Sequence, residues 1–327
     1  MRRLFLILLS GIFLLVLPSS AQVALRQIPE QNIEIIAKKI ILNHLRPDQK
    51  RVGRLIFAGG WTLTSANPNW GGVSAMMRVG QEFFLISDAG GVTEFPFDEQ
   101  NLSTQGRIRE IPKGCGAHWI KSDQDTESLA QDPLTGEYWI GREWSNSICK
   151  FDTSLRTTTK ERMIPEMRMW PRTGGVEAMV RLQDGRFLAF AERAVLADDP
   201  LTPVLLFSGD PTKNTVRAML LKYRAPAGYR PVDAAQLPDG RVLVLNRRFA
   251  LPFSFTTKLV IIDLAEVNNI ATLKGQEVAH FAPPLVSDNF EALAIENTKD
   301  GPMIWIASDD NFLFLQKTLL LKFRLAE

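Results

Sequence analysis

The chain has 327 residues, of which 45% are hydrophobic and 23% are charged, a composition ordinary for a globular protein. Removing Arg2 and Arg3 with an expected leader segment leaves 36 of the 38 basic residues, against 36 acidic ones, so the formal net charge is zero. This balance argues against nucleic acid or an anionic membrane surface as the main partner.

The first 21 residues have the pattern of a signal peptide. Arg2 and Arg3 form a basic region, residues 4–17 are apolar, and Ser19-Ser20-Ala21 is a small-residue cleavage site. The apolar run is 14 residues long, shorter than the roughly 20 needed to span a bilayer. We therefore expect cleavage after Ala21 and a periplasmic or secreted protein without a membrane span. An uncleaved N-terminal anchor is the less favoured alternative.

Residues 22–53 form an N-terminal extension before the first clear strand. Its apolar stretch at 33–42 predicts either a short helix or an outer strand, and the pattern does not choose between them. From Arg54 onward strand patterns are continuous, so we predict one domain over residues 54–327.

A pattern that recurs five times predicts the fold. In each copy, a small apolar block is followed by a hydrophobic run that ends in charged residues. Four of the five blocks contain an acid. Aligned on Glu177, the copies fall at steps of 54, 50, 56 and 58 residues, at Val73, Glu127, Glu177, Asp233 and Glu291. A period near 40–50 residues with several short strands per unit is typical of a β-propeller blade.

Each repeat offers four short strands separated by turn residues. In the third repeat they are expected at 176–182, 186–192, 203–209 and 217–225. The last repeat has only three, and the strand at 54–63 could supply the fourth, which would hide both sheet edges. We favour an all-β propeller of five four-stranded blades closed by this N-terminal strand. Six blades would result if residues 22–50 contributed further strands.

The repeat also predicts where polar side chains gather. Because the first two strands of a blade are antiparallel, the start of the first lies beside the end of the second, on one rim of the ring. Ionised carboxylates crowd together only with protons, arginines or a metal among them. The starts carry Glu127, Glu177, Asp233 and Glu291, and the ends carry Asp88, Glu143, Glu192, Arg193, Arg247, Arg248, Asp309, Asp310 and Asn311.

Hard oxygen ligands from several blades suit calcium, which accepts six to eight oxygens in loose geometry. The predicted metal ligands are Glu127, Glu177, Glu291 and Asp309. Acidic residues at strand ends also commonly satisfy backbone N–H groups, so each of these carboxylates taken alone has a structural alternative.

Nucleophilic catalysis by serine, cysteine or histidine has little support. Ser74 in the segment GGVSAM lacks the second glycine of a nucleophile elbow, and the three histidines lie outside the repeated blocks. Cys115 and Cys149 are the only cysteines. An oxidising compartment permits them to pair, and the sequence leaves open whether they do.

Several blocks resemble the exported bacterial phytase-like proteins, described as "esterase-like activity of phytase". They include DTESLA (125–130), GGVEAM (174–179) and LPDGRVLVLNRR (237–248), and the resemblance extends over residues 54–325. It implies an exported propeller that hydrolyses esters or phosphomonoesters, by relation to calcium-dependent propeller phytases. Asn246, Ser128 and Ala292 depart from the residues usual in the family. The most specific signature is carried by Asn289, Phe290, Glu291, Asp309, Asp310, Asn311, Phe312, Gln316 and Thr318.

The predicted function is a metal-assisted hydrolase of a small phosphate or other ester, using calcium. The predicted catalytic residues are Glu177, Glu291 and Asp310, and Arg193, Arg247 and Asn311 are predicted to bind substrate. A propeller that binds a ligand or partner without catalysis is the main alternative. A carbohydrate-acting propeller with paired carboxylates is the third. A closed ring has no obvious partner edge, so we expect a monomer.

Overall fold

The computed structural model describes residues 28–112, 125–195, 200–251, 254–265 and 272–326. The expected signal peptide and Cys115 lie outside these ranges. Within them the regular structure is almost entirely strand, with one 3-10 turn, η2 (Pro165–Met167), so the predicted all-β class is confirmed. No helix in the described part of the chain is long and apolar enough to cross a bilayer.

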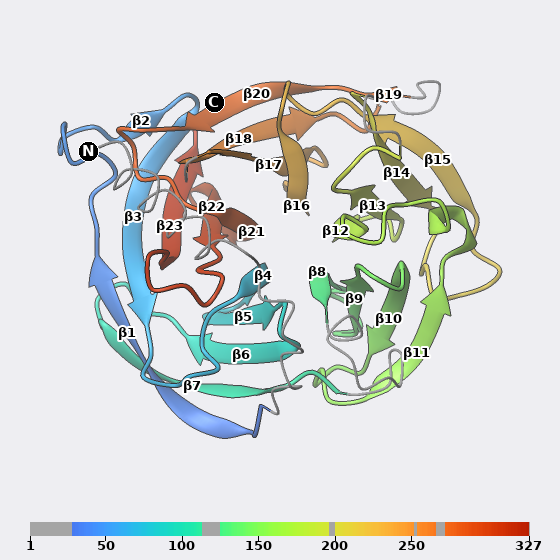
Figure 1. Cartoon of the computed structure of the whole chain (residues 1–327), viewed down its shortest axis with the longest axis horizontal. Coiled ribbons are helices and arrows are strands. Elements are labelled where there is room, and N and C mark those ends of the chain that lie inside the picture. Colours follow the sequence, from blue (N-terminus) through green and yellow to red (C-terminus); the bar gives the residue numbers. More distant parts are fainter. Residues whose placement is uncertain (1–27, 113–124, 196–199, 252–253, 266–271, 327) are drawn as a thin grey trace, which may run out of the picture.

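The strands form sheets arranged around a central axis, which is the architecture of a β-propeller (Figure 1). The strands nearest the axis are β4 (Val73–Val79), β8 (Thr126–Gln131), β12 (Val176–Arg181), β16 (Arg230–Gln236) and β21 (Phe290–Thr298). Each pairs antiparallel with the next strand of its group, respectively β5 (Glu82–Ser87), β9 (Tyr138–Arg142), β13 (Phe187–Ala191), β17 (Val242–Ala250) and β22 (Gly301–Ser308).

Two further strands complete each group toward the outside. They are β6 (Gly91–Pro96) and β7 (Ser103–Glu110), β10 (Ser147–Phe151) and β11 (Thr158–Met163), β14 (Thr202–Phe207) and β15 (Ala218–Tyr223), β18 (Ser254–Ile262) and β20 (Gly275–Phe281), and β23 (Thr318–Leu325) with β3 (Leu55–Thr64). Two short strands attach at the edge, β2 (Arg51–Val52) beside β3 and β19 (Thr272–Leu273) beside β15.

The ring closes through the N-terminal part of the chain. β3 pairs with β23, so the last group is completed by a strand that precedes the first group, as predicted. The extension forms a strand, β1 (Gln31–Lys39), rather than a helix. β1 pairs with β7 through residues 31–36 and with β3 through residues 36–39, and so joins the first and last groups into one sheet.

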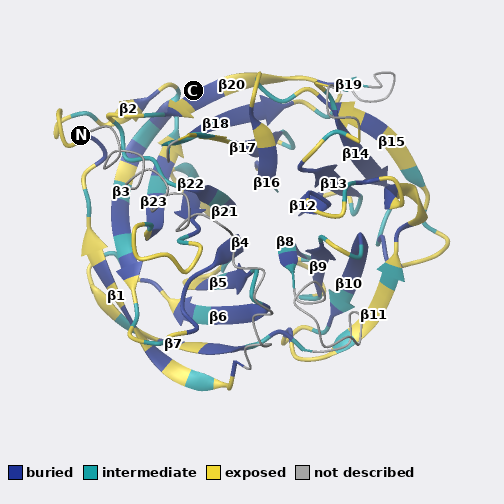
Figure 2. Ribbon diagram, viewed as in Figure 1, coloured by how far each residue is buried: buried dark blue, intermediate teal, exposed yellow. Residues whose placement is uncertain are grey.

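Burial follows the position of each strand in its group. β13 and β14 are buried at every residue, because neighbouring sheets cover both of their faces. The outer strands β11 and β15 are mostly exposed or half-buried (Figure 2). Cys149, in the buried part of β10, is disulfide-bonded.

A cluster of charged and aromatic side chains fixes the junction between the first and last groups. The Arg78 guanidinium lies 4.6 Å from the Phe83 ring and 5.0 Å from the Trp305 ring, and its Nε is 3.3 Å from Glu296. Trp305 is fully buried and donates its indole N–H to Glu296 over 2.8 Å. Residues from β4, β5, β21 and β22 therefore hold the ring closed here.

Replacing Trp305 with phenylalanine should lower the free energy of unfolding by about 1.5 kcal/mol, because it removes the hydrogen bond to Glu296 and leaves a small void. Urea denaturation followed by far-UV circular dichroism measures the change. Leu134→Ala, at an exposed turn, is the control and should stay within about 0.5 kcal/mol of the wild type. An unchanged midpoint for Trp305→Phe would contradict a stabilising role for this cluster.

Candidate functional site

Each of the innermost strands contains a bulge near its start. The register to the second strand shifts by one residue there, which leaves one residue of the inner strand unpaired and re-aims its side chain. The bulged residues are Ser74, Glu127, Glu177, Val232 and Glu291. The sequence alignment is therefore wrong by one residue in the first and fourth repeats, where Ser74 and Val232 occupy the place assigned to Val73 and Asp233.

Asp233 is not part of the polar mouth. Its carboxylate is buried and accepts the backbone N–H of Ala234 over 2.8 Å and that of Leu293 over 2.6 Å. Burial raises the pKa of Asp233 well above its ordinary value. The equivalent Ser128 makes a similar link, donating its hydroxyl to the Val176 carbonyl over 2.9 Å. Both residues join neighbouring inner strands.

The residues after the second strands lie beside the starts of the inner strands, as predicted. The Glu143 N–H donates to the Asp125 carbonyl over 3.3 Å, and the Asp309 N–H donates to the Asn289 carbonyl over 2.9 Å. The N–H groups of Asp88 and Glu192 likewise donate to carbonyls just before the inner strands of their groups. In the fourth group the equivalent residue is Arg247, which lies opposite Arg230. One rim of the ring therefore carries four carboxylates and one arginine at equivalent positions.

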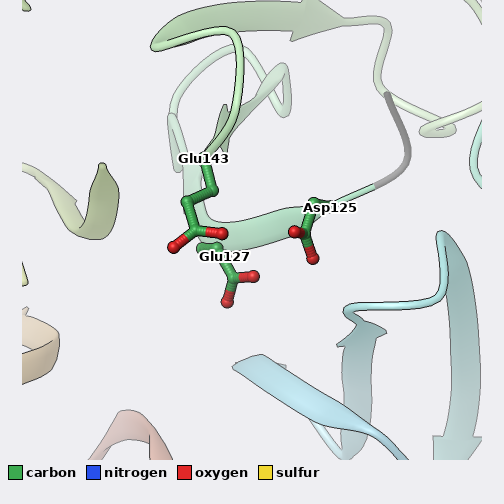
Figure 3. A group of neighbouring side chains, drawn as sticks. All are labelled: Asp125, Glu127 and Glu143. Carbon is green, nitrogen blue, oxygen red and sulfur yellow. The ribbon is translucent and has the colours of Figure 1, made fainter. Parts of the chain in front are cut away.

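Three carboxylates on this rim form a compact group, which we call the acidic triad. Asp125, Glu127 and Glu143 each place an oxygen within 4.8 Å of the others (Figure 3). Asp125 also accepts the indole N–H of Trp144 over 2.7 Å. Within the described residues no lysine or arginine forms an ion pair with the triad. The donor set of three carboxylates suits a hard cation such as Ca²⁺.

Burial and the proximity of other acids raise the pKa values of Glu127, Glu143 and the neighbouring Glu177. Burial, and then the charges of Glu177 and Asp125, raise the pKa of Glu127 well above its ordinary value. Burial and the neighbouring Asp125 raise the pKa of Glu143 to about 8. Glu177 is buried beside them, and burial together with the charge of Glu192 raises its pKa well above the ordinary value. Without a cation, protons must therefore relieve the repulsion at neutral pH.

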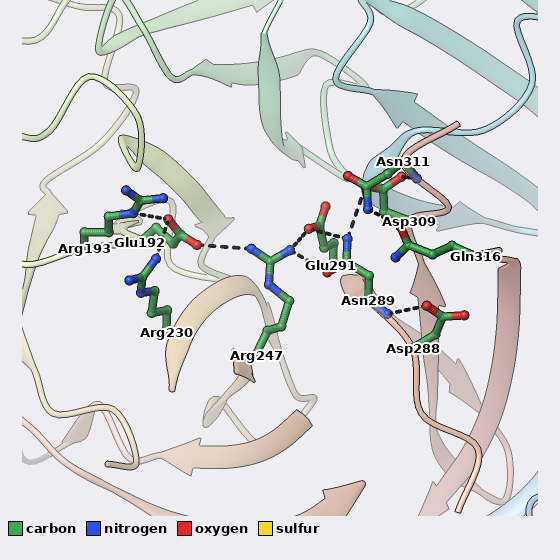
Figure 4. Close-up of polar contacts among 10 residues, drawn as sticks. All are labelled: Glu192, Arg193, Arg230, Arg247, Asp288, Asn289, Glu291, Asp309, Asn311 and Gln316. Carbon is green, nitrogen blue, oxygen red and sulfur yellow. Dashed lines mark hydrogen bonds and ion pairs between the residues drawn. The ribbon is translucent and has the colours of Figure 1, made fainter. Parts of the chain in front are cut away.

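The opposite side of the mouth is neutralised by arginine. Arg247 donates to Glu192 over 3.1 Å and to the side-chain carbonyl of Asn289 over 2.7 Å, and it forms an ion pair with Glu291 (Figure 4). Glu192 also binds Arg193 over 2.8 Å and lies 3.7 Å from Arg230. We call these residues, with Arg247 at their centre, the arginine cluster. The side chains of Arg193 and Arg230 are 45% and 50% exposed, so they also face solvent.

The four predicted metal ligands are thus divided between two environments. Glu127 lies in the acidic triad and Glu177 borders it, whereas Glu291 is paired with Arg247. Asp309 accepts the Asn289 amide over 3.2 Å and the Asn311 N–H over 2.7 Å. Burial, and then the charge of Asp88, raise the pKa of Asp309 to about 8.

Sequence reasoning did not select Asp125 as a site residue. The signal that could have found it is its position directly before an inner strand, opposite Glu143, the acid that follows the paired second strand. The same rule places Asn289 opposite Asp309.

Asp310 connects the last group to the first. It accepts the Gly72 N–H over 3.0 Å and the Thr318 hydroxyl over 2.9 Å. Gly71 has a φ of +116°, and a Cβ there would lie 2.5 Å from Asp310 Oδ1, so a larger residue would clash. The predicted substrate-binding residue Asn311 follows at a φ of +49°, which asparagine tolerates, whereas the next residue, Phe312, is strained at +52°. A catalytic role for Asp310 and substrate binding by Asn311 stay predictions.

Several solved structures resemble this chain at low sequence identity. Hydrazine synthase from Kuenenia stuttgartiensis is 12% identical with a TM-score of 0.39, and the match covers 75% of this chain and 58% of that one. A protein of unknown function from Bacteroides thetaiotaomicron is 12% identical with a TM-score of 0.46, covering 90% and 77%. The β-propeller domain of Cps50 (Swd1) from Myceliophteria thermophila is 8% identical with a TM-score of 0.44, covering 90% and 100%.

Likenesses of this size say nothing about activity, and the propeller assignment rests on the strand pairings of the chain itself. No curated protein matches the chain. A family model does match, over residues 68–312, which include every innermost strand and the polar mouth. The chain therefore belongs to the phytase-like family, whose description reads "esterase-like activity of phytase".

Proposed function

We propose that the protein is an exported, metal-assisted hydrolase of a phosphate or other ester. The observation that carries this proposal is the division of the mouth into an acidic triad, which has no cationic partner among the described residues, and an arginine cluster on the opposite side. The first suits a cation and the second suits an anion. The family description, esterase-like activity of phytase, supports the same reaction class.

In this proposal Asp125, Glu127 and Glu143 hold the ion, which differs from the ligand set expected from the sequence. A bound Ca²⁺ would polarise the ester oxygen and activate water. Burial and the charge of Glu192 raise the pKa of Glu177, and in its protonated form Glu177 can donate a proton to the leaving oxygen. Arg193, half-exposed at the mouth, can bind the anionic oxygens of the substrate.

Two further proposals concern location and oligomeric state. The signal-peptide pattern supports a periplasmic or secreted location, and the closed ring supports a monomer.

Calcium titration of the protein by calorimetry tests the proposed site. We expect binding in the micromolar range. Glu127→Gln should weaken it at least about 100-fold, because even the loss of an outer-shell partner costs about 10–100-fold. Glu291→Gln should leave it nearly unchanged, because Glu291 is paired with Arg247.

Glu166→Gln is the matched control, because Glu166 is an exposed acid on η2, outside the triad. If Glu291→Gln abolished calcium binding and Glu127→Gln did not, the ligand set proposed here would be wrong. A panel of phosphate and carboxyl esters then tests hydrolysis. Turnover should require calcium and fall with Glu127→Gln.

A propeller that binds without catalysis is the second candidate. The loop after Asp310 exposes a run of apolar side chains at the mouth, of which Phe314 is 94% exposed, followed by Leu315 at 74%. Exposed apolar side chains in a strained loop are typical of a binding surface. Calcium binding without turnover of any ester in the panel would favour this function over hydrolysis.

A further inference from the structure

A cavity of about 540 Å³ opens beside the acidic triad, outside the ring of bulged residues. It lies between the turn that joins β9 to β10 and the connection from β11 to β12, and its volume is typical of small-molecule sites. Its walls include Trp144, Asn146, Met163, Arg168, Trp170 and Arg172.

One wall of this cavity is flat, apolar and held in place. Trp144 is 40% exposed, and its indole N–H is fixed by the 2.7 Å hydrogen bond to Asp125. Trp170 is buried, and its carbonyl accepts the Asn146 side-chain N–H over 3.2 Å, which ties the turn to the connection. The exposed Met163 completes an adaptable apolar surface. Such a wall suits an aromatic ring, which stacks on indole at little entropic cost.

The other wall carries positive charge. Arg168 and Arg172 are exposed, and neither side chain has an ion pair or a hydrogen bond to any described residue. The lining contains no Asp or Glu among the described residues. Arg193, Arg230 and Arg247 in the arginine cluster, by contrast, are engaged by Glu192. Two unengaged guanidinium groups favour a phosphate, phosphonate or carboxylate.

We propose that this cavity binds a small anion that carries a flat apolar group, the class of aryl phosphates, phosphonates and carboxylates. The anionic group lies at Arg168 and Arg172 and the ring lies against Trp144. The proposal goes beyond hydrolysis, because the cavity requires neither a metal nor turnover. If the protein also hydrolyses esters, the Trp144–Asp125 hydrogen bond places this ligand class next to the acidic triad.

Titration with phenylphosphonate tests the cavity, because this probe has both features and no ester bond to cleave. The titration is made with a chelator present and is followed by tryptophan fluorescence and calorimetry. We expect saturable binding at one site, about tenfold tighter than that of methylphosphonate, which lacks the ring. Arg168→Gln and Arg172→Gln should each weaken binding by about tenfold, the usual loss for a charge-assisted hydrogen bond.

Two further variants make the test specific. Trp144→Leu should reduce the preference for phenylphosphonate over methylphosphonate to about twofold, because only the ring contacts the indole. Arg217 is an exposed arginine directly before β15 and is not among the residues that line the cavity. Arg217→Gln should therefore leave both affinities unchanged. The thermal midpoints of the two arginine variants should match the wild type, because both side chains are exposed.

The proposal would be overturned by an absence of saturable binding, or by wild-type affinity in both Arg168→Gln and Arg172→Gln. A loss of binding in Arg193→Gln with none in Arg168→Gln would also overturn it, because the probe would then lie in the arginine cluster. Calcium affinity is measured on the same variants. Its loss in Glu127→Gln would leave the phenylphosphonate result unaffected, which separates this proposal from the proposed hydrolysis.

Discussion

Replacing Arg247 with methionine should lower the free energy of unfolding by about 3 kcal/mol at pH 7. Arg247 is the cation that Glu192 and Glu291 share, and the side chains of all three are at most 20% exposed. Among the described residues, removing it leaves Glu291 with the Asn289 amide as its one partner, at 2.9 Å, while Glu192 keeps Arg193. A carboxylate that stays largely desolvated without a cation costs several kcal/mol, and this penalty is the source of the expected loss.

Urea denaturation separates this effect from a simple loss of packing. The proteins compared are the wild type, Arg247→Met, Arg248→Met and the double variant Arg247→Met/Glu291→Gln. Arg248→Met is the matched control at the next position, where the side chain is exposed, and it should change stability by less than about 0.5 kcal/mol. Adding Glu291→Gln to Arg247→Met should recover most of the loss, because the amide carries no charge. If the double variant were as unstable as Arg247→Met alone, the charge argument would be wrong.

With a chelator present, the protein should become more stable as the pH falls from about 8 to about 5. Glu143 and Asp309 have folded pKa values raised to about 8, from ordinary values of 4.5 and 3.8. Between those values the folded state binds more protons than the unfolded state, so stability falls as the pH rises through this window. For Asp309, which is 4% exposed, the slope is about 1 kcal/mol per pH unit.

Acids with lowered pKa values act in a different window. The pKa of Asp152 is lowered to about 2 by hydrogen bonds from Arg156 and Ser154, which outweigh its burial. Its contribution to stability is present above the ordinary pKa of aspartate and is lost only as the pH falls from about 4 toward 2. It therefore does not mask the trend between pH 5 and pH 8.

Thermal midpoints measured from pH 5 to pH 9 test the prediction. The double variant Glu143→Gln/Asp309→Asn should flatten the curve, because it removes two groups that take up protons on folding. Asp300→Asn, at an exposed turn, is the control and should reproduce the wild-type slope. A wild-type midpoint that rose from pH 5 to pH 8 would contradict the raised pKa values at the mouth.

The architecture could be predicted from the sequence because the relevant contacts are local. Strands within one repeat pair with their immediate neighbours, so turn residues and alternating hydrophobic runs indicate them directly. The position of Glu143 beside the start of its inner strand follows from the same antiparallel rule. The closing strand at 54–63 could also be found, because the last repeat was one strand short and an open edge is unfavourable.

The tertiary structure decided which carboxylates act together. A one-residue bulge puts Val232 at the mouth and places Asp233 in a contact between inner strands. The spacing of the repeats in the sequence does not reveal a shift of one residue. Glu291 and Glu127 occupy equivalent positions in the repeat. Of these two acids, Glu291 alone forms an ion pair with Arg247, which belongs to another repeat. The charge state of an acid depends on distances across the channel between residues far apart in the chain. The sequence alone determined the ring and its polar rim, and only the folded ring determined which carboxylates of the described rim have an arginine as their partner.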